Sequence, residues 1–206
     1  MSVLMLCGSP HNEGGNSTYI LEGLKDIMGL EAKIYNTMNS PEIAESMFIK
    51  TIKNGDNIVL SFPLYADSLP AYFLGFLKRL EKAAQGIVSQ SKVYVIVNNG
   101  FYDAVQNHIA IRIVSKWCEK CGLTMGRALA VGAGGMAQAA PIGKGPLLKL
   151  GTALEDIADN IKNSETGDTI FVEPAFPRFL YKLVGNMGFT KQGKENGLKK
   201  AEITGH

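Results

Sequence analysis

Runs of consecutive apolar residues alternate with helical patterns along most of the chain. The clearest runs cover residues 3–7, 58–60 and 93–97, and weaker ones cover 32–35 and 128–131. An unbroken apolar run suits a strand that is covered on both faces, as the strands of parallel sheets are. The pattern therefore predicts five buried strands.

Between these runs, apolar residues recur at the spacing of a buried helical stripe. The stripes lie within residues 20–28, 73–80 (after Pro70), 109–121 and 150–161, and a less regular helix is predicted for 41–52. Strand and helix alternating five times is the pattern of right-handed βαβ crossovers. We therefore expect an α/β fold: a doubly wound five-stranded parallel sheet, order 2-1-3-4-5, with helices on both faces.

Composition narrows the class of protein. The chain has 206 residues, 46% of them apolar, and 21 Lys and Arg stand against 19 Asp and Glu. This balance disfavours a disordered chain, a coiled coil and a strongly basic nucleic-acid binder. No apolar run is long enough to span a membrane, and the first residues do not resemble a signal peptide. We expect a soluble, cytoplasmic protein that binds neither nucleic acid nor membranes.

The last part of the chain differs from the rest in charge. Residues 174–206 contain six of the basic residues but only Glu195 and Glu202 as acidic ones. We predict a domain over 1–173 and a basic C-terminal extension over 174–206 that packs on the domain or on a partner subunit. An interaction of this extension with anionic partners is the alternative.

Three cysteines are too few for a disulfide framework. Cys118 and Cys121 have the spacing of a redox pair, but they end a helical pattern, where the helix dipole opposes a thiolate. Zinc would need further ligands, and His11, His108 and His206 are scattered. We interpret the two thiols as packing residues and predict no metal site.

The segment after the first predicted strand is rich in glycine and in neutral donors. Residues 8–18 read GSPHNEGGNST and lead directly into a helix. Glycines let backbone amides turn inward, and a helix N-terminus adds unsatisfied N–H groups and partial positive charge. We predict a phosphate site at Ser9, Asn16, Ser17 and Thr18; simple helix capping by Asn16 or Ser17 is the alternative.

Aromatic and amide residues follow the next two central strands. Pro63, Leu64 and Tyr65 follow one, and the segment Asn98, Asn99, Gly100, Phe101 and Tyr102 follows the other. Taken singly, the first segment could simply cover an apolar edge, and the second could be only a turn. In the expected strand order all three segments meet at one crevice, whose phosphate site and planar slot suit flavin mononucleotide (FMN).

Residues 132–137 match the dinucleotide pattern G-x-G-x-x-A, but they follow the last predicted strand rather than opening a βαβ unit. We interpret them as a loop near the flavin edge or the nicotinamide site.

The motifs resemble those of the flavodoxin-like NAD(P)H-dependent FMN reductases, a family that includes iron-sulfur flavoproteins. Gly8-Ser9-Pro10 with 15–18 is similar to the family's phosphate loop, here one residue longer. Pro63-x-Tyr65 with Pro70 and Leu77-Lys78-Arg79 is similar to its second flavin loop. The resemblance implies that 9 and 16–18 bind the phosphate, 63–65 flank the ribityl chain and ring, and 98–102 contact the ring edge. A basic residue is common where His11 stands, and the four-cysteine cluster motif is absent.

The expected function is an FMN oxidoreductase that takes hydride from NADPH or NADH and passes electrons to a quinone, a nitro or azo compound or another small acceptor. No side chain is predicted to be catalytic, because flavin N5 carries the chemistry. The alternatives are a flavodoxin-type electron carrier without NAD(P)H turnover, and a site for another phosphorylated ligand. Flavin reductases of this kind often complete their sites across an interface, so we expect a homodimer.

Overall fold

Six parallel strands form one sheet in the order β2-β1-β3-β4-β5-β6. The structure is a computed structural model that describes residues 2–11 and 14–198. The strands are β1 (Val3–Cys7), β2 (Ile34–Asn36), β3 (Asn57–Pro63), β4 (Lys92–Asn98), β5 (Thr124–Val131) and β6 (Ile170–Val172). β1, β3 and β4 lie in the middle, where almost every residue is buried.

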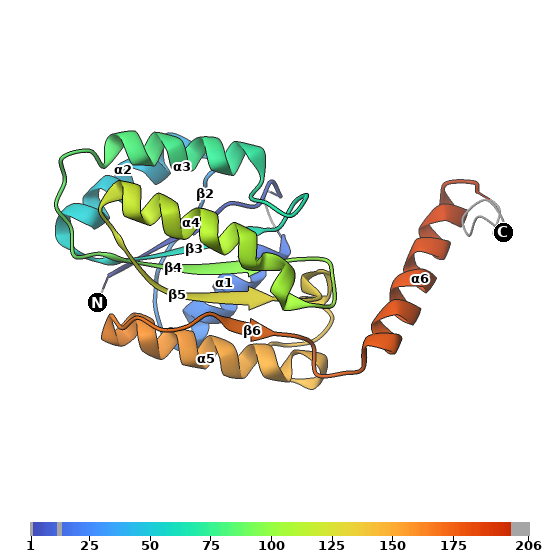
Figure 1. The fold of residues 1–206 in the computed structure, drawn as a ribbon. Helices are drawn as coiled ribbons and strands as arrows, with labels where there is room; N and C mark the ends of the chain where they lie inside the picture. The colour runs from blue at the N-terminus through green and yellow to red at the C-terminus, as the bar shows by residue number, and fades with distance from the viewer. Residues whose placement is uncertain (1, 12–13, 199–206) are drawn as a thin grey trace. The chain divides into compact units, whose positions relative to one another are not determined.

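Helices cover both faces of this sheet (Figure 1). α1 (Asn16–Met28) and α5 (Leu148–Asn163) pack on one face, and α2 (Pro41–Asn54), α3 (Ala71–Ala83) and α4 (His108–Cys121) pack on the other. Side chains of a strand alternate between the faces: Met5 packs with α1 and α5, whereas Leu6 packs with the helices of the other face. The two apolar clusters that result explain why these strands read as unbroken apolar runs.

The predicted α/β fold and the relative order of the five predicted strands are confirmed, but the number of strands was wrong. β6 is a sixth strand, added at the edge beside β5 by pairing of Leu129 with Ile170 and Val131 with Val172. It has only three residues, and Phe171 is exposed. Three residues are too few to show an alternation of apolar and polar positions in the sequence. The segment is recognised as a strand only by its pairing with β5.

The chain divides into two units, Met1–Pro174 and Ala175–His206. Within the second unit, α6 (Arg178–Glu195) follows Pro177, a residue that favours a helix start. The sequence pattern did not predict this helix, because its apolar residues are interrupted by glycines and lysines. Packing of this unit on the domain or on a partner remains a prediction, and Lys199, Lys200 and Glu202 lie outside the described residues.

Among the described residues, no helix has both the length and the apolar character needed to cross a membrane. Cys118 and Cys121 are buried on α4 within the apolar cluster of that face. Burial raises the pKa of the Cys118 thiol, and burial together with nearby Glu81 raises the pKa of Cys121 to about 12. Both thiols therefore stay protonated near neutral pH, which opposes thiolate chemistry.

Tyr94 on β4 links the sheet to the end of α5. Its hydroxyl lies 2.8 Å from the carbonyl oxygen of Asn160 and 2.9 Å from that of Glu165. Burial, followed by the nearby Glu165 charge, raises the pKa of Tyr94 to about 12. The folded state therefore holds this proton more tightly than the unfolded chain, whose tyrosines ionise near pH 10.

Tyr94 should thus stabilise the fold fully below about pH 10, and this stabilisation should be lost as the pH rises toward about 12. We expect the free energy of unfolding to fall less steeply over this window in Tyr94→Phe than in the parent protein. Urea unfolding at a series of pH values measures the difference. Parallel pH profiles for the two proteins would contradict the assignment.

Candidate functional site

A cleft of about 190 Å³ opens at the carboxyl ends of β1, β3 and β4. The strand order reverses between β1 and β3, and ligands of doubly wound sheets bind outside the carboxyl ends of the strands at such a reversal. The described residues that line the cleft are Ser9, His11, Asn16, Ser17, Pro63, Leu64, Tyr65, Asn98, Asn99, Gly100 and Gly135. Three loops far apart in sequence, together with Gly135 of a fourth segment, therefore form one site.

Most of the residues predicted for the site line this cleft. Those that do are Ser9, Asn16, Ser17, Pro63, Leu64, Tyr65, Asn98, Asn99 and Gly100. Thr18 does not: its hydroxyl lies 3.3 Å from the sulfur of Cys7 on β1. Phe101 and Tyr102 also lie outside the lining, and Phe101 is 57% exposed. Contact of these three residues with a ligand remains a prediction.

Carbonyl groups of the first loop accept hydrogen bonds from two side chains outside the described lining of the cleft. The Tyr72 hydroxyl of α3 donates to the carbonyl oxygen of Gly8. The Asn36 amide donates to the carbonyl oxygens of Ser9 and His11, both at 3.1 Å. With these acceptors occupied, the loop can present N–H groups rather than carbonyl oxygens to a ligand, as an anion requires. Residues 12 and 13 of this loop lie outside the described residues.

The first turn of α1 lies at the cleft, because Asn16 and Ser17 belong to its lining. Tyr19 makes the first intrahelical bond, its amide donating to the Gly15 carbonyl at 3.0 Å, so the amides of residues 16–18 precede the helical ladder. The N-cap residue Gly15 has no side chain to cap them, and the first turn contains no acidic residue. Capping by a side chain therefore does not explain this loop, and the helix end is suited to an anion.

Ser17 and Asn98 connect the first loop to the third. The Asn98 amide donates to the Ser17 hydroxyl at 2.6 Å, and both residues are buried. Because the hydroxyl oxygen accepts this bond, the Ser17 hydroxyl hydrogen remains for another acceptor. The same Asn98 amide lies 3.3 Å from the carbonyl oxygen of Phe62, which ties both residues to the end of β3.

The second loop is a tight turn that presents Tyr65. The amides and carbonyls of Tyr65 and Ser68 bond to one another at 2.9 and 3.0 Å. Between them, Ala66 and Asp67 have φ angles of 47° and 58°, which non-glycine residues rarely adopt. The surrounding structure must hold this strained turn. It leaves Tyr65 44% exposed at the edge of the cleft, where its ring can pack against a planar ligand.

The third loop is organised by the side chain of Asn99. Its amide nitrogen donates to the carbonyl oxygen of Asp103 at 3.1 Å, and its amide oxygen accepts from the Phe101 amide at 2.8 Å. Its side chain therefore stabilises its own loop, and this sets the position of Gly100 in the lining. Asn99 itself also lines the cleft, and its contact with a ring edge remains a prediction.

A fourth segment completes the cleft. Gly135 lines it, in agreement with the interpretation of residues 132–137 as a loop near this site. Gln138 donates from its side chain to the carbonyl oxygen of Gly14 and, at 3.1 Å, to the side-chain oxygen of Asn16. Gln138 and Asn36 were missed by sequence reasoning. Asn36 is the last residue of β2 and Gln138 follows β5, but neither belongs to a motif, and only the fold brings them to the first loop.

The described lining contains no Asp, Glu, Lys or Arg. An anion would therefore meet hydrogen-bond donors and the α1 dipole without a carboxylate to repel it. Toward Tyr65 the lining becomes apolar, through Pro63 and Leu64. The cleft thus has a donor-rich end and an aromatic end, and these suit a ligand with an anionic group at one end and a planar ring at the other.

Asn36 provides a test of how the first loop is held. Replacement by alanine removes both bonds to the carbonyl oxygens of Ser9 and His11. We expect this to weaken binding of a phosphate-bearing ligand by about 1–2 kcal/mol, since the loop would lose its preorganised shape. Titration of FMN by calorimetry checks this, with the exposed neighbour Asn39→Ala as the control. Equal affinity in both variants would contradict the role of Asn36.

No protein-family model matches the chain, and no curated protein matches it in sequence. Solved structures do match its fold. An NADPH-quinone reductase from P. pentosaceus has a TM-score of 0.57 and 16% identity, covering 77% of this chain and 98% of that one. A Fusobacterium nucleatum flavodoxin bound to flavin mononucleotide has a TM-score of 0.54 and 14% identity, covering 81% and 100%.

A third similar structure is an NADH:FMN oxidoreductase in its apo form, with a TM-score of 0.56, 11% identity, and coverage of 80% and 90%. At these identities the likeness shows the fold, which is flavodoxin-like. It assigns no ligand or activity to this chain.

Proposed function

We propose that the first unit binds FMN in the cleft and works as an NAD(P)H-dependent oxidoreductase. Its second substrate would be a quinone, a nitro or azo compound or another small electron acceptor. The observation that carries this proposal is the lining of the cleft. An uncharged, donor-rich pocket at the α1 N-terminus continues into an aromatic and amide-lined slot at the reversal of the strand order.

The residues that line the cleft fit FMN. Ser9, Asn16 and Ser17, together with the first amides of α1, would hold the phosphate. Segment 63–65 would flank the ribityl chain and one ring face, and segment 98–100 would lie at the ring edge. Structures of similar fold include a flavodoxin bound to flavin mononucleotide and an NADH:FMN oxidoreductase, which supports the choice of ligand.

Hydride exchange at the flavin nitrogen N5 is the chemistry that FMN would supply when bound. The side chains of this protein would bind and orient. Tyr65, held by its strained turn, would pack against the ring, and the Ser17 hydroxyl, held by Asn98, would donate to the phosphate. No acid-base residue of the chain is required for hydride transfer, so the described lining needs no catalytic carboxylate or lysine.

An electron carrier without NAD(P)H turnover is the second candidate. This candidate is favoured because the fold matches a flavodoxin with nearly the same TM-score as it matches a reductase. A carrier would bind FMN in the same cleft but would not oxidise nicotinamide nucleotides at a steady rate.

An absorbance spectrum of the purified protein, followed by anaerobic titration with NADPH and NADH, separates these functions. A yellow protein that either nucleotide bleaches, and that turns over with a quinone, is the expected result. A yellow protein that neither nucleotide reduces would be a carrier. Colourless protein that takes up no added FMN, or that prefers an unrelated nucleotide, would overturn the flavin assignment.

A further inference from the structure

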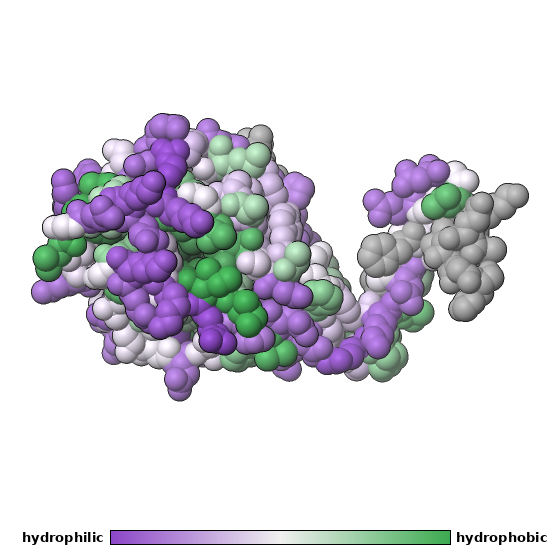
Figure 2. All heavy atoms as spheres, turned by 45° about the horizontal axis from the view of Figure 1, so that its top comes forward, coloured by the Kyte–Doolittle hydropathy of each residue, from purple (hydrophilic) through white to green (hydrophobic). Residues whose placement is uncertain are grey.

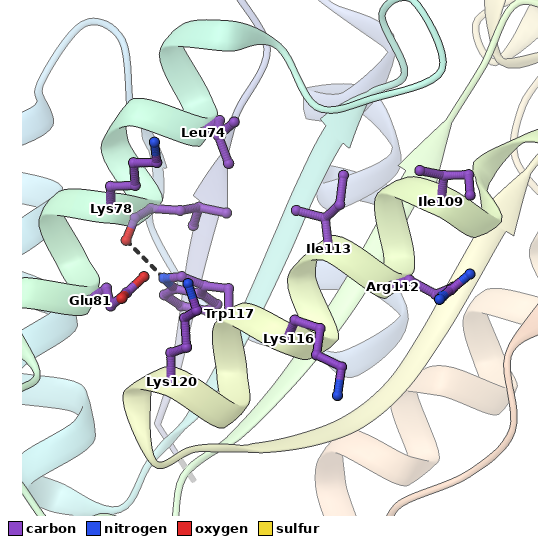
Figure 3. Close-up of a pocket in the computed structure, with 10 residues that line it drawn as sticks. Leu74, Lys78, Glu81, Ile109, Arg112, Ile113, Lys116, Trp117 and Lys120 are labelled. Carbon is purple, nitrogen blue, oxygen red and sulfur yellow. Dashed lines mark hydrogen bonds between the residues drawn. The ribbon is translucent and has the colours of Figure 1, made fainter.

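A groove of about 440 Å³ runs between α3 and α4, and the buried residues Leu77 and Trp117 of these helices form part of its floor (Figure 3). Its apolar lining is Leu74, Leu77, Ile109, Ile113 and Trp117. Ile109 is 38% exposed, and Leu74 and Ile113 are half-buried, so apolar surface is open to solvent here. The lining of α4 from Ile109 to Lys120 covers about three helical turns, or about 16 Å.

Basic side chains flank this apolar floor. Arg112, Lys116 and Lys120 follow one another at four-residue spacing on α4, beside the stripe of Ile109, Ile113 and Trp117. Lys78 stands on α3. Figure 3 shows Ile113 pointing from α4 toward α3, whereas Arg112 and Lys116 point away from α3. On this face of the molecule, apolar surface lies next to strongly hydrophilic side chains (Figure 2).

Basic residues outnumber acidic ones along this groove. Glu81 is the one carboxylate among the described lining residues. Lys116 pairs with Glu119 at 2.8 Å, but Lys78, Arg112 and Lys120 form no ion pair with any residue that the structure describes. The chain as a whole is nearly neutral, with 21 basic and 19 acidic residues. A local group of cations along an apolar groove is therefore a feature of this surface.

We infer that the groove between α3 and α4 is a docking site for an acidic, amphipathic helix of a partner protein. An apolar stripe at i, i+3, i+4 and i+7 would fill the floor, as in other helix-in-groove complexes. Acidic residues beside that stripe would face Lys78, Arg112 and Lys120. This inference does not depend on FMN binding, because the groove and the cleft share no lining residue.

Charge and burial favour this occupant over others. The helix α6 of a second copy carries Arg178, Lys182, Lys191 and Lys194 against Glu195, so it would bring like charge to the groove. A nucleic acid would use an exposed aromatic face for stacking. Trp117 is only 5% exposed, and its ring N–H already donates to the Leu77 carbonyl at 2.8 Å.

Binding of synthetic peptides to the full-length protein tests the proposal. The probe is a labelled peptide of about 16 residues, with leucine at i, i+3, i+4 and i+7 and glutamate at most other positions, tested in three leucine registers. Its controls are a peptide of the same composition with leucines spread around the helix, and one with lysine in place of glutamate. Trp117 is the only tryptophan of the chain, so its emission reports directly on the groove.

We expect at least one acidic amphipathic peptide to bind at micromolar concentration, to shift Trp117 emission, and to weaken with added salt. The double variant Arg112→Glu with Lys120→Glu should bind about tenfold more weakly. The control Lys149→Glu, an exposed lysine in the first turn of α5, should bind like the parent protein.

Three results would overturn the proposal: scrambled or basic peptides binding as well as the acidic ones, an equal loss in Lys149→Glu, or binding without a change at Trp117. Binding of decanoate or of anionic lipid vesicles at this groove, with no peptide bound, would also overturn it. Circular dichroism of each variant distinguishes a lost contact from a lost fold.

Discussion

Replacing Asn16 with aspartate is expected to weaken FMN binding by about 2 kcal/mol or more, or about 30-fold, without destabilising the fold. Asn16 is the first residue of α1 and lines the cleft. A carboxylate there would lie beside the phosphate and repel it. The same carboxylate would interact favourably with the helix dipole, and it could still accept the bond from Gln138. The affinity for FMN should therefore fall in Asn16→Asp while the stability of the fold does not.

Calorimetric titration with FMN and thermal unfolding of the same samples measure the two effects. The matched control is Leu148→Asp, which places the same charge at the exposed first residue of α5, outside the cleft lining. The control should bind FMN like the parent protein. Unchanged affinity in Asn16→Asp would show that the phosphate does not lie at the α1 N-terminus, and the proposed orientation of the ligand would then be wrong.

Replacing Gly132 with alanine is expected to destabilise the protein by about 2–3 kcal/mol. Gly132 follows β5, and its amide donates to the carbonyl oxygen of Val172 on β6 at 2.8 Å. A Cβ atom at this position would lie 2.2 Å from the carbonyl oxygen of Tyr102 and 2.9 Å from the amide nitrogen of Ala104. Both are backbone atoms, so the third loop would have to move as a whole.

Gly135→Ala is the control for this substitution. It lies three residues further along the same segment, where an added Cβ would meet nothing within 4 Å. Urea unfolding should show a lower midpoint for Gly132→Ala and a nearly unchanged one for Gly135→Ala. Equal stability of the two variants would mean that the backbone around Gly132 shifts at little energetic cost. Contact between the third and fourth loops would then not stabilise the cleft.

The sequence pattern was most informative for the buried strands. Runs such as 3–7 and 93–97 are apolar at every position because both sheet faces are covered, and this property can be read without tertiary information. β6 and α6 were not predicted. β6 has three residues and exists as a strand by pairing with β5, and α6 has interrupted apolar spacing.

The site residues divide in a similar way. Ser9, Asn16, Ser17 and Tyr65 follow predicted strands, so the rule that ligands bind at the carboxyl ends of parallel strands brought them to one edge. Asn36 ends β2 and Gln138 follows β5, but their roles depend on bonds to carbonyl groups of another loop. The spacing of residues along the sequence does not indicate a hydrogen bond between segments that are remote from one another.

The sequence alone thus determined the layers, the order of the first five strands and the edge at which the loops gather, because hydrophobic periodicity and chain connectivity are local properties. Only the tertiary structure decided which side chains face the cleft and which stabilise their own loops, as Asn99 does. It also decided that Arg112 and Lys120 share an apolar groove with Lys78 of another helix. These arrangements depend on distances between segments that are remote in sequence, and packing of the helices on the sheet sets those distances.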